Sequence, residues 1–511
     1  MSAPVLLAEP IASRPCRAID WPALDAQAWK ATRHWEKGIL QRCPGEKWRT
    51  LAELSRSFLW DKVARALRRS CIPASWEPRA NDPIEGQAIY QQWNVQHPLP
   101  RQTLWRRTRR YCRQALERVA ARFRRRTVFV PVWCDRLGRT VAELLDRGNV
   151  EVATASPVSP IDPRVRRCFI TRRAIPDLAG DAHELLVAVK QGLADFGVAL
   201  LEEDEAALGL QLHQLLAAAF RVEEEFRDVR PDLVLTHADN HPPPQIYVSH
   251  ARRLGIRTVM LQHGLDCEQF CLSEAFADVL LTWGPARQRR YCAEASVDPA
   301  RVHVIGNPEW DERRPDQQIG RGGQRWLWTT RPHVARKCYV PSDTPQDGIE
   351  VLGGLLCALR EQPHANLVIK PHPFDYLLPY QDLLATVDEP LRQRVRIITD
   401  RTVLALLAEC DLLISEDSSA LLEGAIAGKP MVYVLPRRRP GTFPELSRGG
   451  ALTCTHPDQL PGLLSQARCL DSVARGRLTA YLRSFIDDHA GPLDGQAARR
   501  AATIIEKLLP R

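Results

Sequence analysis

The residues best placed to do chemistry lie in the stretch "DLLISEDSSALLEGAIAGKPMVYV", positions 411–434. An apolar run, Leu412–Ile414, is followed at once by two acids and three hydroxyls, and then by a helix pattern of small residues. The hydroxyls of Ser418 and Ser419 and the first N–H groups of this helix can hold a phosphate, with about 1.5–3 kcal/mol for each charge-assisted hydrogen bond. Ordinary helix capping explains one hydroxyl and one acid, but it does not require Glu423 one turn further on.

A second polar group follows another apolar run. In "KPHP", at positions 370–373, Lys370 and His372 come directly after a strand-like segment, and the two prolines stiffen the turn. A lysine and a histidine at a strand end could neutralise the charge of a departing phosphate. The plain alternative is a surface turn that carries two solvated bases.

Two more polar groups follow strand-like runs in the preceding part of the chain. "HADN", His237–Asn240, follows "LVLT", and "QHG", Gln262–Gly264, follows "TVML". Ligands of open parallel sheets collect at the carboxyl ends of the strands, so Asp239 and His263 are rival candidates for a general base. For His263 the alternative is a buried histidine that hydrogen-bonds a backbone carbonyl.

The elements that must position these residues alternate between strand and helix along two stretches of the chain. The first contains "TVFVPVW", "VEVATA", "RPDLVLTHADN" and "RTVMLQHG", and the second contains "WLWTT", "ANLVIKPHP", "RVRIITD" and "GGALTC". Such alternation is typical of parallel sheets covered by helices. We therefore predict an α/β protein with two Rossmann-like domains whose parallel sheets face a cleft.

At 511 residues the chain is too long for one compact core. A long helical region is expected at about 181–227, within the first domain. The predicted organisation is a helical, basic N-terminal extension at 1–126, an N-terminal Rossmann-like domain at 127–310, a linker at 311–325, a C-terminal Rossmann-like domain at 326–485 and a C-terminal helix at 486–511.

The composition limits the classes of protein to which the chain can belong. Its 44% hydrophobic and 26% charged residues are those of an ordinary soluble protein, and no apolar run reaches the roughly 18 residues of a membrane span. The first residues lack the features of a secretory signal, and the 14 cysteines without paired short spacings favour reduced thiols. We expect a cytoplasmic protein.

The net charge of +9 is distributed unevenly. Residues 1–126 carry 25 Lys and Arg against 11 Asp and Glu, a net charge of +14, so the remaining residues sum to −5. The basic excess is densest at 101–126, where apolar residues recur at helical spacing between arginines. Such a helix can dock on an anionic membrane surface, at the inner face of the cell membrane, or pack on its own protein. We do not expect nucleic acid as a partner.

The two-domain layout and the run "SSALLEGAIAGKPMV" resemble the GT-B glycosyltransferase superfamily. The combination of "KPHP" and "SEDSS" resembles the His-Pro and Ser-Ser motifs of bacterial sialyltransferases and Kdo transferases, and equally those of CDP-glycerol glycerophosphotransferases. "TVMLQHG" followed by "GNPEWD" is similar to proteins of surface-polysaccharide biosynthesis. The resemblance covers about residues 127–485.

This resemblance implies a metal-independent glycosyltransferase without a cofactor, which uses a nucleotide-activated sugar, CMP- or CDP-linked, as its donor substrate. The acceptor would be a glycan or a lipid-linked glycan, held by the N-terminal domain. His372 would contact the donor phosphate, Ser418 and Ser419 would bind the same phosphate, and Glu423 would bind the ribose hydroxyls. The matching motifs also place Lys370 and Asn307 among the donor-binding residues.

The chain departs from the sialyltransferase pattern because it lacks an Asp-Asp-Gly or Glu-Asp-Gly triplet, so its general base is not identified by the resemblance. A non-hydrolysing nucleotide-sugar 2-epimerase shares the fold, but its "HGDT" and "EAGLR" signatures are here "HADN" and "QHGLD". A glycan-binding scaffold with the same fold is the alternative without enzyme activity. His263, Cys267 and Cys271 have helical zinc-ligand spacing, yet no fourth ligand is evident and Gly264 favours a loop, so no metal is expected.

Overall fold

The computed structural model describes Lys30 and the greater part of the chain from residue 125 onward. The described segments are 125–156, 162–168, 170, 173–194, 199–200, 202–239, 243–265, 277–294, 296–313, 319–320, 322–331, 345–372, 375, 377–435 and 441–510. The predicted arginine-rich helix at 101–126, except its last two residues, and nearly all of the predicted N-terminal extension lie outside them.

The N-terminal domain is built on a seven-stranded parallel sheet with the order β3-β2-β1-β4-β5-β6-β7. Its central strands are buried on both faces because helices cover them. The strands are β1 (Arg126–Phe129), β2 (Val150–Thr154), β3 (Arg166–Arg167), β4 (Leu233–Thr236), β5 (Arg257–Leu261), β6 (Val279–Thr282) and β7 (Val302–Val304). The helices beside the sheet are α5 (Gly138–Asp146), α8 (Pro244–Arg253) and α9 (Pro285–Glu294).

The C-terminal domain contains a six-stranded parallel sheet with the order β10-β9-β8-β11-β12-β13. Its strands are β8 (Arg325–Thr329), β9 (Asn366–Lys370), β10 (Val395–Ile397), β11 (Leu412–Ser415), β12 (Met431–Val434) and β13 (Leu452–Cys454). Its helices are α10 (Pro345–Glu361), α11 (Leu378–Ala385), α12 (Glu389–Arg392), α13 (Val403–Glu409), α14 (Ala420–Ile426) and α15 (Leu460–Arg468). The prediction of an α/β protein with two Rossmann-like domains is therefore confirmed.

Both sheets reverse their winding direction at one place. In the N-terminal domain the reversal lies between β1 and β4, and in the C-terminal domain it lies between β8 and β11. The loops that leave two such strands run to opposite faces of the sheet, which opens a crevice at their carboxyl ends where ligands of this architecture bind. The stretch after β11 that contains Ser418 and Ser419 therefore begins at the switch point of its sheet.

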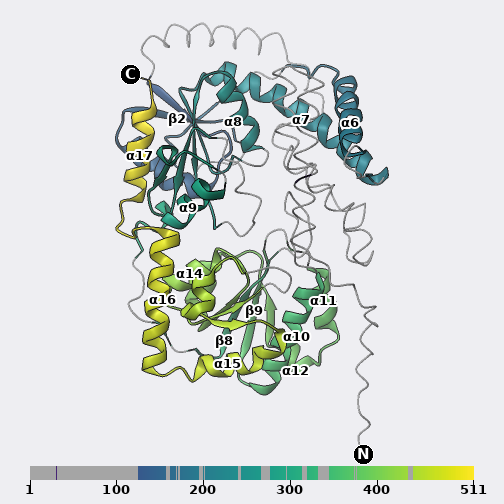
Figure 1. The fold of residues 1–511 in the computed structure, drawn as a ribbon, viewed down its shortest axis with the longest axis vertical. Helices are drawn as coiled ribbons and strands as arrows, with labels where there is room; N and C mark the ends of the chain where they lie inside the picture. Colours follow the sequence, from purple (N-terminus) through teal and green to yellow (C-terminus); the bar gives the residue numbers. More distant parts are fainter. Residues whose placement is uncertain are drawn as a thin grey trace, which may run out of the picture.

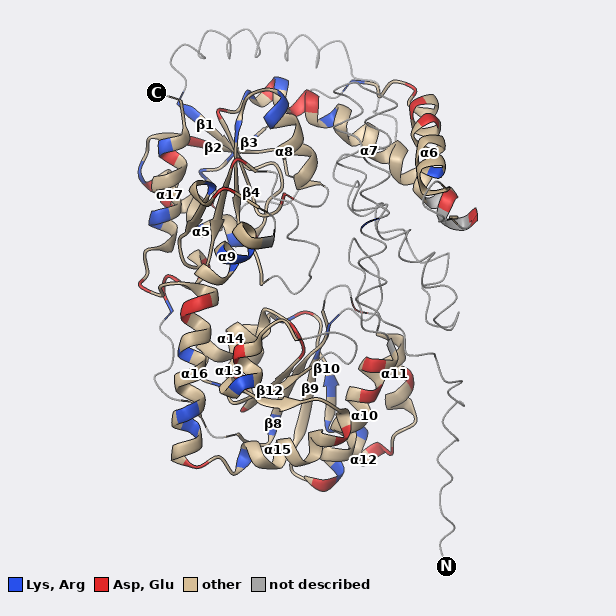
Figure 2. Cartoon of the chain, viewed as in Figure 1, with Lys and Arg blue, Asp and Glu red and all other residues tan. Residues whose placement is uncertain are grey.

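Two long helices enlarge the N-terminal domain between β3 and β4. They are α6 (Ala179–Ala194) and α7 (Glu202–Val229), which confirm the helical region expected at about 181–227. They pack on each other and, through α7, on α8, and Figure 1 shows them projecting to one side of the domain. Acidic and basic segments are interspersed over both domains in Figure 2. No described helix has the length and apolar character needed to cross a membrane.

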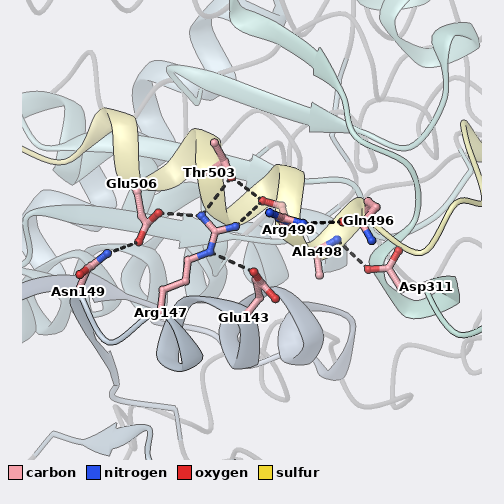
Figure 3. A network of polar contacts seen from close by, with 9 residues as sticks. All are labelled: Glu143, Arg147, Asn149, Asp311, Gln496, Ala498, Arg499, Thr503 and Glu506. Atoms are coloured by element: carbon pink, nitrogen blue, oxygen red, sulfur yellow. Dashed lines mark hydrogen bonds and ion pairs between the residues drawn. The ribbon is translucent and has the colours of Figure 1, made fainter.

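The C-terminal segment joins the two domains. Helix α16 (Ser472–Ala490) packs on the C-terminal domain, and α17 (Ala497–Leu508) then returns to pack on α5 of the N-terminal domain (Figure 1). Arg147 fixes α17 against the N-terminal domain, since it donates hydrogen bonds to Glu506, to Thr503 and to the Arg499 carbonyl (Figure 3). The carboxylate of Asp311 accepts the N–H groups of Ala497 and Ala498, each at 2.8 Å, and so caps α17.

The crossing between the domains brings backbones very close together. A Cβ atom added to Gly284 would lie 2.2 Å from the Asp488 carbonyl oxygen, and one added to Gly491 would lie 2.2 Å from the Trp283 carbonyl oxygen. Gly491 also has a φ of +68°, which favours glycine. This crossing, around Gly284 and Gly491, is called the joint between the domains. Trp283 and Trp310 of the N-terminal domain also contribute to it, because they belong to the same buried cluster as α14 and α16.

We expect Gly284→Ala to lower the stability of the protein, because its methyl group would push α16 away from α9. Forced overpacking of this kind costs about 1–3 kcal/mol. Differential scanning calorimetry measures the effect. Gly462→Ala in α15 is the matched control, since its Cβ has nothing within 4 Å and alanine favours a helix by about 0.5–1 kcal/mol. Equal melting temperatures for the two variants would show that the contact between the domains accommodates the added methyl group without loss of stability.

Candidate functional site

The predicted phosphate-binding turn begins a helix, as expected. Helix α14 has Ser419 as its N-cap, and the preceding strand β11 ends at Ser415. The Ser418 hydroxyl accepts the Ala420 N–H at 3.2 Å, whereas Ser419 makes no side-chain capping bond. Both serines are half-buried. Ser418 is therefore engaged in the turn, and Ser419 is the hydroxyl at this helix start that capping does not use.

The acid Asp417 fixes the shape of this turn. Its carboxylate is buried and accepts hydrogen bonds from the Tyr433 hydroxyl and from the Thr442 hydroxyl and N–H. The Arg331 guanidinium, also buried, lies 3.8 Å from the same carboxylate. Sequence reasoning assigned one acid of this stretch to helix capping. In the structure Asp417 instead ties the turn to β8, to β12 and to the loop at 441–443.

The "KPHP" group lies at the end of β9. The His372 N–H donates to the Thr330 hydroxyl at 3.1 Å, and the side chain of His372 is half-buried. Lys370 donates from Nζ to the Thr399 carbonyl at 2.9 Å, on the β10 side of the strand. Burial lowers the pKa of Lys370, and nearby Asp400 raises it in part. The structure thus ties the main chain of His372 to the end of β8, and it gives the ammonium of Lys370 a partner on the β10 side.

Strand β8 lies between β9 and β11, and the sequence analysis did not identify the polar residues at its end as part of the site. Thr329 donates to the Ser415 hydroxyl at 2.6 Å, while Thr330 contacts His372 on the other side. Arg331 follows directly and donates to the Asp417 carbonyl at 3.3 Å. The signal was available, because "WLWTTR" is an apolar run that ends in polar residues, as the other four strand ends do.

In the N-terminal domain His263 is held in one orientation. Its Nδ1 lies 2.7 Å from the His237 carbonyl oxygen, and the two imidazole rings meet edge to face with centroids 5.3 Å apart. A carbonyl accepts only an N–H, so Nδ1 carries the proton and Nε2 is the basic nitrogen of the neutral ring. Burial, and then the charge of Arg136, lowers the pKa of His237 to about 4, so His237 is neutral near pH 7.

The other predicted residues of this domain are more deeply buried. Asp239 is 3% exposed and accepts the Ala277 N–H at 2.9 Å. Asn307 is 1% exposed, and its side-chain oxygen accepts the Glu309 N–H at 3.0 Å. The Nδ2 group of Asn307 has no hydrogen-bond partner among the described residues. Asp239 thus holds the segment before β6, and Asn307 retains one donor that this structure does not use.

Charges of the N-terminal domain reach Glu423 of α14. Burial raises the pKa of Glu423 to about 7, Arg136 and Arg313 lower it, and Glu309 raises it further. Arg136 itself pairs with Glu309 at 3.5 Å and lies over the Trp283 ring. Helix α14 therefore lies within electrostatic reach of the N-terminal strand ends. Arg136, in the short 3-10 helix Asp135–Leu137 between β1 and α5, is a further residue that the sequence analysis did not identify.

Among the described residues, one cluster of possible metal ligands is occupied by ion pairs of its own. Of the three residues with zinc-ligand spacing, Cys267 and Cys271 lie outside the described residues. Within the described part of the chain, Glu445, Asp488 and His489 place one ligand atom each within 4.8 Å of the others. Asp488 is paired there with Arg289 at 2.5 Å, and His489 with Glu445 at 3.3 Å. An arginine on one carboxylate opposes a cation at this position.

No known protein family and no curated protein matches the sequence. Among solved structures, the UDP-GlcNAc 2-epimerase from Neisseria meningitidis is similar to this chain, with 15% identity and a TM-score of 0.46. The match covers 75% of this chain and 100% of the epimerase chain. A glycosyltransferase from Rickettsia africae matches 75% over 98%, with 11% identity and a TM-score of 0.43. The α,α-trehalose-phosphate synthase (UDP-forming) from Burkholderia vietnamiensis matches 75% over 99%, with 15% identity and a TM-score of 0.42. Similarity at this level does not extend to substrate or reaction.

The raised pKa of Glu423 predicts how stability depends on pH. The folded protein binds this proton more tightly than the unfolded chain, whose pKa is near 4.5. The stabilising contribution is therefore complete below pH 4.5 and is lost as the pH rises through about 7, a change of about 3 kcal/mol. Glu423→Gln should remove this loss and be more stable than the wild type at pH 8.

Urea unfolding between pH 5 and pH 8 measures the difference between the two proteins. Glu361→Gln, at the exposed end of α10, reports the effect of removing a surface carboxyl group. If the advantage of Glu423→Gln does not increase with pH, the carboxyl group of Glu423 is not buried as the structure describes.

Proposed function

We propose that this protein is a glycosyltransferase that transfers a sugar, or a polyol phosphate, from a nucleotide-activated donor to a surface-polysaccharide or lipid-linked acceptor. One observation carries the proposal. The switch point of the C-terminal sheet gathers Ser418, Ser419, Thr330 and His372 from three adjacent strand ends. Hydroxyls, a helix start and an imidazole are groups that bind phosphate and stabilise its charge as it departs.

The proposed roles follow the position of each group. The hydroxyl of Ser419 binds the donor phosphate, and Ser418 shapes the turn by accepting the Ala420 N–H. His372 approaches the same phosphate from β9 and donates a hydrogen bond to the leaving oxygen. Glu423, one turn into α14, binds the ribose hydroxyls. Lys370 contributes positive charge at longer range, because its ammonium donates to the Thr399 carbonyl.

His263 is the better placed of the two proposed bases. Its Nδ1 proton is committed to the His237 carbonyl, so Nε2 is the nitrogen that can accept the proton of an acceptor hydroxyl. Asp239 is buried beneath the segment before β6 and already accepts a backbone N–H. The motif resemblance favours a CMP- or CDP-linked donor, without a metal ion. We also propose that residues 101–126 hold the enzyme against an anionic membrane surface, a proposal that rests on the sequence alone.

A nucleotide-sugar 2-epimerase is the second candidate. The observation that favours it is the pair of imidazoles of His237 and His263 at one edge of the N-terminal sheet, since proton transfer at a sugar carbon also requires bases. Product analysis separates the two reactions. A transferase releases free nucleotide in proportion to acceptor, whereas an epimerase returns an isomer that keeps its nucleotide.

The proposed donor site predicts selective stabilisation by one nucleotide. A ligand present at 100 times its dissociation constant adds about 2.7 kcal/mol to the free energy of unfolding. Thermal-shift measurements with CMP, CDP, UDP and GDP should therefore single out one base, and we expect a cytidine nucleotide. The shift should disappear in Ser419→Asp, in which a carboxylate repels the phosphate, and should persist in the control Ser447→Asp. No shift with any of the four nucleotides contradicts the proposal.

The proposed base predicts a change in the pH–rate profile. His263→Ala should lose the acidic limb of the profile and reduce the turnover number by about 100- to 10,000-fold, because removal of a general base costs that much. Asp239→Asn should keep the limb and lose mainly thermal stability. Nucleotide release from the donor, measured between pH 5 and pH 9, tests both variants. An acidic limb that survives in His263→Ala but not in Asp239→Asn assigns the base to Asp239.

A further inference from the structure

A buried carboxylate beside the His372 turn has no assigned role so far. Asp375 is 7% exposed and follows "KPHPF" at the end of β9. Its carboxylate accepts hydrogen bonds from the Thr330 hydroxyl and, at 3.0 Å, from the Tyr380 hydroxyl. All three side chains are buried, and they come from the ends of β8 and β9 and from α11.

The same residues hold the main chain of His372 on both of its sides. The His372 N–H donates to the Thr330 hydroxyl oxygen at 3.1 Å, and the His372 carbonyl accepts the Asp375 N–H at 2.9 Å. The second bond closes a turn from residue 372 to residue 375. Asp375 therefore holds the main chain of His372 in two ways. It does so directly through its own backbone N–H and indirectly through the hydroxyl of Thr330.

The direction of the Thr330 hydroxyl depends on the carboxylate. A hydroxyl has one proton to donate, and its oxygen accepts with the remaining lone pairs. The His372 N–H can only donate to the Thr330 oxygen, so it occupies a lone pair, and the Thr330 proton is directed to Asp375. Burial, and then Asp375, raises the pKa of Tyr380 well above its ordinary value, so Tyr380 stays a donor. The edge contact of Tyr380 with Trp328, at 5.6 Å between centroids, fixes its ring.

We propose that Asp375 is a positioning residue for the transfer reaction, which sets the place of His372 through the hydroxyl of Thr330. This inference rests on the proposed role of His372 at the donor phosphate. A misplacement of about 1 Å at a reacting centre reduces rates by about 100-fold.

The test uses substitutions in the full-length protein, and Thr330→Val and Asp375→Asn keep the size of the side chain. Thr330→Val removes the hydroxyl and keeps the shape, Thr330→Ser restores the hydroxyl, and Asp375→Asn removes the charge. Thr386→Val is the matched control, because its hydroxyl bonds a carbonyl at the exposed end of α11. His372→Ala sets the size of the effect when the imidazole itself is lost.

The first measurement is amide hydrogen exchange in protein labelled with ¹⁵N-histidine, with the His372 signal identified by its absence in His372→Gln. Exchange at His372 should accelerate about tenfold or more in Thr330→Val and Asp375→Asn, because the bond that protects its N–H is lost or weakened. Thr330→Ser and Thr386→Val should retain the wild-type rate. Equal exchange rates in Thr330→Val and Thr330→Ser would overturn the proposal.

The second measurement is the kinetics of nucleotide release from the donor whose nucleotide stabilises the protein most. Thr330→Val and Asp375→Asn should lower kcat about tenfold or more while the KM for the donor changes less than about threefold. Adding Asp375→Asn to His372→Ala should cost little more, since residues that act as a unit are not additive.

The two measurements separate the proposals. If His372→Ala keeps the wild-type kcat while the exchange results hold, the catalytic role of His372 fails and Asp375 only orders the turn. If His372→Ala is impaired but Asp375→Asn and Thr330→Val are not, the positioning role of Asp375 is overturned and the proposed function stands.

Discussion

The burial of carboxylates at the carboxyl edge of the C-terminal sheet is the constraint on which the rest of the structure depends. A carboxylate that leaves water loses many kcal/mol of hydration unless donors replace the water. Asp417 meets this demand with Tyr433, Thr442 and Arg331, and Asp375 meets it with Thr330 and Tyr380. The donors come from different elements. The ends of β8, β9 and β11 therefore cannot move apart without leaving a charge unpaired.

The N-terminal domain shapes its strand ends by other means. His263 is oriented by a backbone carbonyl, Asp239 accepts a backbone N–H, and Gln262 accepts the N–H of Trp283. Its polar groups are chiefly imidazoles and amides, whereas the opposite domain offers hydroxyls and a helix start. This division suits the proposed transfer, in which the C-terminal domain would bind the charged donor and the N-terminal domain would accept the proton of the acceptor.

The joint between the domains limits how these two edges can meet. Helix α16 belongs to the C-terminal domain and α17 to the N-terminal domain, and the short connection between them passes the N-terminal strand ends at backbone contact. Asp311 caps α17 and Arg147 anchors it, so the return of the chain is held by charge as well as by packing. Glu423 lies close enough to this joint for Arg136 and Glu309 to affect its pKa.

The sequence by itself determined the alternation of strands and helices, the parallel sheets and the start of α14 after Ser419. Each of these follows from local periodicity and capping, which neighbouring residues set. It also placed His372 and Ser418 at strand ends, because an apolar run that stops at polar residues marks a strand end in any parallel sheet.

Only the tertiary structure decided which of these residues meet. Thr330 and Asp375 are 45 positions apart along the chain, and the order of the sheet makes them neighbours. Tyr380, five positions after Asp375, reaches the same carboxylate from α11. The role of Asp417 was hidden for the same reason, since its partners Arg331 and Thr442 are 86 and 25 positions away. Hydrogen-bond partners over such distances depend on strand order and loop path, and no local pattern encodes them.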